Sequence, residues 1–209
     1  MPLDTEKKTK MIFSSFGFCK VIPAEKLALV ICRENLSEKN CFILPYAGFH
    51  VEKTFEREKR GLVDFGFSSE RVHLLKSPEQ LLEIRPDFIY VPGGDPFKLL
   101  DHVRTLGLRD AIQEAVLYRE AVYIGVSAGA DLATEDIEYV CRLEDNNYNR
   151  RYFSALDLIP EVILCHRDHY PYSVLKECME ETEKEVITLR DDQVVLYENG
   201  VWQYVGEEI

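Results

Sequence analysis

The chain has 209 residues, of which 46% are hydrophobic and 30% charged, and its formal net charge is −12. This length is enough to bury one sizeable core but short for two, so we expect a single domain over residues 1–209. The excess of acidic residues repels phosphate backbones, and no basic stripe offsets it. We therefore expect no nucleic acid partner.

The six cysteines are scattered and include no C-x-x-C pair, which indicates neither a zinc site nor a dense disulfide framework. The first residues include no apolar stretch of the kind found in a secretory signal. No apolar run approaches the roughly 20 residues of a membrane span. We expect a cytoplasmic protein with no membrane partner.

Apolar runs that predict buried strands alternate along the chain with amphipathic stretches that predict helices. This alternation predicts an α/β fold in which a mostly parallel sheet has helices on both faces, with antiparallel strands added at the C-terminal edge. The expected strands span residues 10–15, 40–45, 71–75, 87–91, 121–126, 161–165, 185–188, 193–197 and 201–205. The expected helices span residues 24–34, 50–65, 97–116 with a break near Gly107, a short stretch after residue 127, and 173–184, and residues 134–151 are expected to form a loop.

The most informative stretch is the apolar strand 121–126 followed by small residues, with Ser127 between Gly125 and Gly129 in a G-x-S-x-G frame. A serine on such a strand-to-helix turn has an exposed hydroxyl, and the glycines permit a strained turn with close backbone neighbours. The free N–H groups of the helix start, including that of Ala128, favour a developing anion. The alternative is that the small residues only allow close packing.

A base must accept the serine proton, and His166 follows an expected strand from which it could reach the same edge of the sheet. Open α/β sheets bind their ligands at the carboxyl ends of the strands. His169 is a rival base that we expect to face solvent. The two histidines could also indicate a metal site, but no helix aligns them and no further ligand is close in sequence, so we expect no metal and no cofactor.

The imidazole needs a carboxylate partner. The Gly93-Gly94 pair, at the end of another expected strand, could offer N–H groups to an oxyanion, or could form a tight turn with Asp95 capping a helix. Candidates for the carboxylate between the serine and the histidine are Glu135, Asp136, Glu138, Glu144 and Asp145.

Three segments resemble one known family. Residues 93–100, GGDPFKLL, resemble its G-G-N-T-F-x-L-L segment, residues 125–130 match its G-x-S-A-G-A elbow, and residues 154–159 are similar to the run before its catalytic histidine. The chain thereby resembles the aspartyl dipeptidase (dipeptidase E) and cyanophycinase-like group of serine peptidases over nearly its whole length.

The resemblance implies a class I glutamine-amidotransferase-like fold and hydrolysis of short peptides with an N-terminal aspartate. It implies Ser127 as nucleophile, His166 as general base, and Gly93 and Gly94 in the oxyanion site. The third catalytic member would fall at Glu144 or Asp145, of which Asp145 has the better spacing.

The sequence departs from the family pattern beside the oxyanion site. Asp95 replaces an asparagine and adds negative charge there, while Pro96 replaces a threonine and is compatible with a helix start. The family binds the substrate aspartate with an arginine beyond the histidine. Arg167, Arg150 and Arg151 are the candidates in this chain.

The leading hypothesis is a serine peptidase that acts on short peptides as a monomer or homodimer. The alternative is a non-catalytic small-molecule-binding or regulatory protein that retains the elbow as a scaffold. A lipase-like hydrolase is disfavoured because the chain is short and its histidine follows the serine by only 39 positions (166 − 127).

Overall fold

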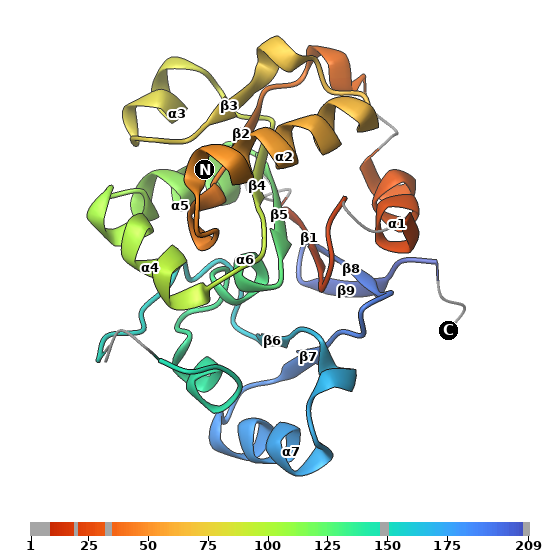
Figure 1. The fold of residues 1–209 in the computed structure, drawn as a ribbon, viewed down its shortest axis with the longest axis vertical. Coiled ribbons are helices and arrows are strands. Elements are labelled where there is room, and N and C mark those ends of the chain that lie inside the picture. The colour runs from red at the N-terminus through yellow and green to blue at the C-terminus, as the bar shows by residue number, and fades with distance from the viewer. Residues whose placement is uncertain (1–8, 19–20, 32–34, 147–150, 207–209) are drawn as a thin grey trace, which may run out of the picture.

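The computed structural model describes residues 9–18, 21–31, 35–146 and 151–206. A seven-stranded sheet in this part of the chain has the order β3-β2-β4-β5-β1-β8-β9 (Figure 1). The first five strands in this order, from β3 to β1, run parallel to one another, whereas β8 is antiparallel to β1 and β9 is antiparallel to β8. The strands are β1 (Lys10–Ser14), β2 (Cys41–Ile43), β3 (Val72–Leu74), β4 (Phe88–Val91), β5 (Val122–Val126), β8 (Val194–Glu198) and β9 (Val201–Tyr204).

Helices cover both faces of the sheet because its strand residues alternate between two apolar cores. Ile12 of β1 belongs to the core that contains Leu27 and Leu62 of α1 and α2, whereas Phe13 belongs to the core that contains Leu99 and Ile112 of α4 and α5. This confirms the expected three-layer α/β fold of the class I glutamine-amidotransferase-like type. The helices are α1 (Val21–Ile31), α2 (Val51–Phe65), α3 (Glu79–Glu83), α4 (Pro96–Thr105), α5 (Arg109–Tyr118), α6 (Ala128–Asp131) and α7 (Tyr172–Glu181).

The long helical pattern at residues 97–116 is interrupted at Gly107, as predicted. Gly107 has a φ of +64°, a left-handed conformation that glycine adopts at little cost, and it separates α4 from α5. The two helices can therefore change direction and still pack their apolar faces on the same side of the sheet.

One prediction about the C-terminal strands is wrong. Only β8 and β9 extend the edge of the main sheet; the segment expected at residues 185–188 forms β7 (Val186–Thr188), which pairs in parallel with β6 (Val162–Leu164). These two strands form a separate small sheet beside α7 at one end of the molecule (Figure 1). Within the described residues, no helix has the length and apolar character needed to cross a membrane.

Candidate active site

Ser127 lies at the carboxyl end of β5, in a turn that its neighbours hold in place. Its backbone has φ 49° and ψ −115°, a conformation that is strained for a residue with a side chain. Its N–H donates to the carbonyl of Ser14 at 3.0 Å, and α6 begins at the next residue. The turn thus aims the serine hydroxyl away from the sheet edge, as the G-x-S-x-G frame predicts.

The frame requires glycine at position 129 for a steric reason. A Cβ atom at Gly129 would collide with the carbonyl oxygen of Val91 on β4, so α6 could not pack so closely against that strand. The Tyr123 hydroxyl also donates a 2.7 Å hydrogen bond to the Gly129 carbonyl. The small residues therefore permit close packing, as the packing interpretation predicts, and they also shape the turn that carries Ser127.

His166 reaches Ser127 although β6, the strand before it, is outside the main sheet. Its N–H donates to Ser15 Oγ at 2.9 Å, which ties the histidine to the carboxyl end of β1. The ring of Phe16 contacts the imidazole edge-on, with centroids 4.9 Å apart. The imidazole Nε2 lies 3.2 Å from Ser127 Oγ. Two segments 39 positions apart (166 − 127) thus meet at hydrogen-bonding distance.

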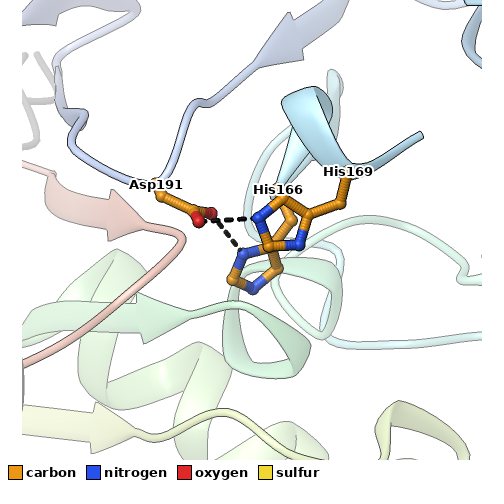
Figure 2. A group of neighbouring side chains, drawn as sticks. All are labelled: His166, His169 and Asp191. Carbon is orange, nitrogen blue, oxygen red and sulfur yellow. Dashed lines mark hydrogen bonds and ion pairs between the residues drawn. The ribbon is translucent and has the colours of Figure 1, made fainter. Parts of the chain in front are cut away.

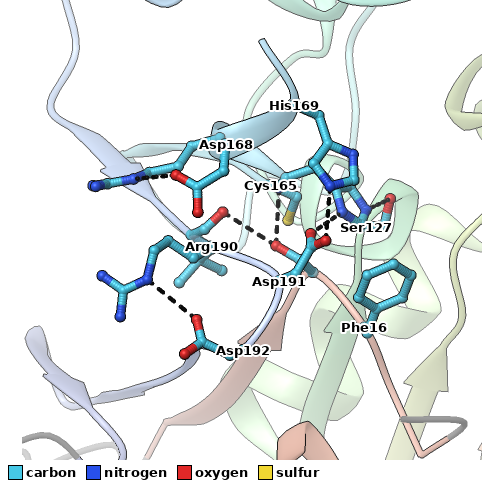
Figure 3. A network of polar contacts seen from close by, with 12 residues as sticks. Phe16, Ser127, Cys165, Asp168, His169, Arg190, Asp191 and Asp192 are labelled. Carbon is cyan, nitrogen blue, oxygen red and sulfur yellow. Dashed lines mark hydrogen bonds and ion pairs between the residues drawn. The ribbon is translucent and has the colours of Figure 1, made fainter.

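The carboxylate that contacts this imidazole is Asp191, which Figure 3 shows close to His169. Its Oδ1 lies 2.7 Å from His166 Nδ1, and its Oδ2 lies 2.8 Å from Nε2 of His169. Partial burial acts to raise the pKa of Asp191, but the hydrogen bonds and electrostatic attraction of the two imidazoles outweigh it and hold that pKa below its usual value. Because an ionised carboxylate can only accept, His166 Nδ1 carries the proton and its Nε2 offers a lone pair to Ser127.

The predicted third members, Asp145 and Glu144, do not occupy this position. Both line a cleft with Gly93 and Gly94, and burial together with the charge of Asp95 raises the pKa of Glu144. The carboxylates predicted for this role all lie between the serine and the histidine in the sequence. The missed signal was the Asp191-Asp192 turn between two C-terminal strands, which the tertiary fold brings to the end of β1.

The Gly93-Gly94 turn lies beside the serine, as expected. A Cβ atom at Gly93 would be 3.1 Å from Ser127 Cβ and 3.6 Å from its Oγ, so the glycine brings backbone next to the hydroxyl. Among the described residues, neither Gly93 nor Ala128 donates its N–H to a backbone carbonyl. Asp95 caps α4 by accepting from the Lys98 N–H at 2.9 Å, so the helix-cap interpretation of this segment is confirmed.

The cleft beside Gly93 has a volume of about 940 Å³ and contains charges of both signs. Its lining includes Lys53 and Arg57 of α2 and His50, the residue before that helix. Asp95 and residues 143–145 also line it. A second hollow of about 480 Å³ lies between residues 138–142 and α7, and none of its lining residues belongs to the serine–histidine site.

The three arginines considered for substrate binding do not line this cleft in the described structure. Arg167 contacts Asp168 Oδ1 and Thr188 Oγ1, both at 3.4 Å, beside the small sheet. Arg151 is exposed, and Arg150 lies outside the described residues. The lysine and arginine that line the cleft, Lys53 and Arg57, instead belong to α2. For this segment the sequence predicts only a surface helix.

A buried carboxyl group lies directly behind the serine turn. Asp131, at the end of α6, is 8% exposed, and burial raises its pKa to about 8. The Tyr139 hydroxyl lies 2.9 Å from Asp131 Oδ1 and 3.0 Å from the Ile163 carbonyl oxygen on β6. One hydroxyl hydrogen cannot serve both acceptors, but a protonated Asp131 donates to Tyr139 and frees Tyr139 to donate to Ile163.

His166, His169 and Asp191 also form a group that could hold a metal ion (Figure 2). One ligand atom from each residue lies within 4.8 Å of the others. The sequence alone predicts no metal at the two histidines, because no helix aligns them and no third ligand is near them in sequence. The fold supplies that third donor from the turn after β7.

Comparisons with known proteins agree on one family. A model of peptidase family S51 matches residues 21–205. A Drosophila melanogaster protein named "Probable alpha-aspartyl dipeptidase" is 34% identical over 130 residues, which cover 61% of this chain and 52% of that protein. Peptidase E of Salmonella newport is 28% identical over 185 residues, covering 85% of this chain and 77% of that one. A solved structure from Listeria monocytogenes EGD-e aligns with a TM-score of 0.73 at 23% identity, covering 94% of this chain and 98% of the other.

Proposed function

Because this chain belongs to peptidase family S51 and is therefore a peptidase, we propose that it cleaves short peptides through an acyl-enzyme on Ser127. The observation that carries the proposal is the line of contacts from Ser127 Oγ to His166 Nε2 at 3.2 Å and from His166 Nδ1 to Asp191 at 2.7 Å. A serine with a base in reach, and a carboxylate that orients the base, is the arrangement that activates a hydroxyl.

In the first half of the reaction, Ser127 Oγ attacks the peptide carbonyl carbon and His166 Nε2 takes the hydroxyl proton. The imidazolium keeps its Nδ1 proton and donates it in a hydrogen bond to Asp191, whose negative charge stabilises the positive charge of the ring. In the proposed reaction, the N–H groups of Gly93 and Ala128 donate to the oxyanion. As the C–N bond breaks, His166 gives its proton to the departing amine.

In the second half, a water molecule replaces the amine. His166 Nε2 takes a proton from the water, whose oxygen attacks the acyl carbon, and Ser127 recovers the proton as the ester bond breaks. Every proton that leaves a nucleophile returns to a leaving group through the same nitrogen, so no other acid or base is needed.

We propose that the substrates are short peptides with an N-terminal aspartate. The cleft beside Gly93 supports this, because Lys53 and His50 in its lining can attract the aspartate carboxylate. Asp145 and Glu144, which also line the cleft, can attract the free amino group. The name of the Drosophila relative, "Probable alpha-aspartyl dipeptidase", supports the same substrate class.

The test of the mechanism compares wild type with Ser127→Ala on aspartyl dipeptides. The variant should lose activity by several orders of magnitude, as other serine triads do. Ser173→Ala changes an exposed serine of α7 and should keep wild-type rates. A fluorophosphonate should label wild type once, at Ser127. Equal rates in wild type and Ser127→Ala, or no labelling, would favour the non-catalytic alternative.

The test of the substrate class compares Asp-Leu, Glu-Leu and Ala-Leu with the wild type and Lys53→Met. Removal of the Lys53 charge should raise KM for Asp-Leu and leave Ala-Leu unchanged. A wild type that cleaves all three equally would show that the cleft charges do not select aspartate.

A further inference from the structure

Asp191 is shared by two imidazoles, and the serine reaction uses only one of them. His166 approaches Oδ1 and His169 approaches Oδ2, at 2.7 and 2.8 Å (Figure 2). The two rings are tilted by 33° with centroids 5.4 Å apart, so both present nitrogen atoms to the same carboxylate. The mechanism above assigns no role to His169.

We propose that His166, His169 and Asp191 form an inhibitory site for a divalent transition-metal ion of the zinc type. Two imidazole nitrogens and one carboxylate oxygen are a donor set that Zn²⁺ favours, with a fourth position left for water. Mg²⁺ and Ca²⁺ prefer oxygen donors in larger number, so this group discriminates against them.

The spacing of the donors suits an ion of this size. Zinc binds nitrogen and oxygen donors at about 2.0–2.2 Å, which places neighbouring ligand atoms about 3.3 Å apart in a tetrahedron. The two nitrogens already lie 2.7 and 2.8 Å from the carboxylate oxygens, and the three donors lie within 4.8 Å of one another. If each nitrogen–oxygen distance lengthened by about half an ångström, the ion would fit between the donors. At each nitrogen the metal would take the place of the proton that now lies in the hydrogen bond to Asp191.

The site is open to ions from solvent. The side chain of His169 is 56% exposed and that of Asp191 is 37% exposed, whereas that of His166 is 18% exposed. The exposed ligand lies outside the serine–histidine contact, so an ion can enter over His169 without passing through the peptide cleft.

Metal binding would disable the base through its tautomer. In the metal-free site, Nδ1 of His166 carries the proton and Nε2 faces Ser127 with a lone pair. A metal on Nδ1 takes the lone pair of that atom, so the proton of the neutral ring moves to Nε2. The proton count of the ring is unchanged, but Nε2 then donates to Ser127 Oγ and cannot accept its proton. This inhibition rests on the proposed function, whereas the binding does not.

The binding test uses untagged, EDTA-treated protein and titrates ZnCl₂ by calorimetry. Wild type and Ser127→Ala should each bind one Zn²⁺ with the same affinity, because the serine is not a ligand. His169→Ala should bind at least about tenfold more weakly, since even partners outside the ligand shell change affinity by 10–100-fold. His50→Ala removes another exposed imidazole and should leave the affinity unchanged.

The activity test adds ZnCl₂ to the peptidase assay. Wild type should lose activity as Zn²⁺ saturates the site and regain it with EDTA, and His169→Ala should need at least about tenfold more Zn²⁺ for half-inhibition. No saturable one-to-one binding, or equal binding by wild type and His169→Ala, would overturn the proposal. Should the protein lack serine peptidase activity, the calorimetric result still decides whether the site binds metal.

Discussion

Replacement of the buried Asp131 by asparagine should change how the stability of the fold depends on pH. The pKa of Asp131 is raised to about 8 in the folded chain, against an ordinary value of 3.8, because burial penalises the carboxylate. Between these two values the unfolded chain has released the proton and the folded chain still holds it. The free energy of unfolding therefore falls as pH rises through this window, and the loss levels off above pH about 8.

The size of the effect follows from linkage. Each unit of pKa difference corresponds to about 1.4 kcal/mol, and integration from pH 5 to pH 8 gives a loss of about 3–4 kcal/mol from this group. An asparagine amide can donate to Tyr139 as a protonated carboxyl does and has no charge to bury. Relative to wild type, Asp131→Asn should thus gain about 3–4 kcal/mol of stability between pH 5 and pH 8.

Urea unfolding followed by the fluorescence of Trp202, the single tryptophan, measures this difference at each pH. Asp110→Asn makes the same chemical change on an exposed residue of α5 and should retain the pH dependence of wild type. A difference between wild type and Asp131→Asn that stays constant from pH 5 to pH 8 would refute the reasoning, because it would mean that Asp131 ionises equally in both states.

Two further predictions concern the serine site. Asp191→Asn should lower kcat by about 10⁴-fold, the loss that this change causes in a Ser-His-Asp enzyme through the wrong histidine tautomer. Asp145→Asn should instead raise KM. If steady-state kinetics show the larger loss of kcat in Asp145→Asn, the orienting carboxylate is Asp145. Gly129→Ala should cost about 1–3 kcal/mol of overpacking and lower kcat, because its methyl group would press on the Val91 carbonyl. In Gly107→Ala the added Cβ meets no atom within 4 Å, so the change should cost only the left-handed backbone penalty, about 1–2 kcal/mol, with kcat unchanged. Chemical denaturation gives the stability of each variant, and parallel peptidase assays give its kcat. Equal kcat values in the two variants would contradict the steric explanation.

Several local features of this structure could be predicted from the sequence, because neighbouring residues cause them. The apolar residues within 10–15 predicted a short strand, and the observed strand is buried on both faces, with Ile12 and Phe13 in different cores. Gly107 predicted the break between α4 and α5, since few other residues tolerate its conformation. The glycines around Ser127 predicted the strained turn. In each case the cause lies within a few neighbouring residues, so composition and spacing are sufficient evidence.

The choice of the carboxylate, by contrast, depended on tertiary structure. Asp191 is 64 positions from Ser127 (191 − 127) and 25 from His166 (191 − 166), in a turn between strands of two different sheets. It reaches the imidazole only because β7 pairs with β6 while β8 pairs with β1. A carboxylate pairs with whichever base the fold places within about 3 Å, and no local pattern encodes that distance. The turn at Ser127 thus follows from neighbouring residues, whereas the packing of the two sheets places Asp191 and His169 next to His166.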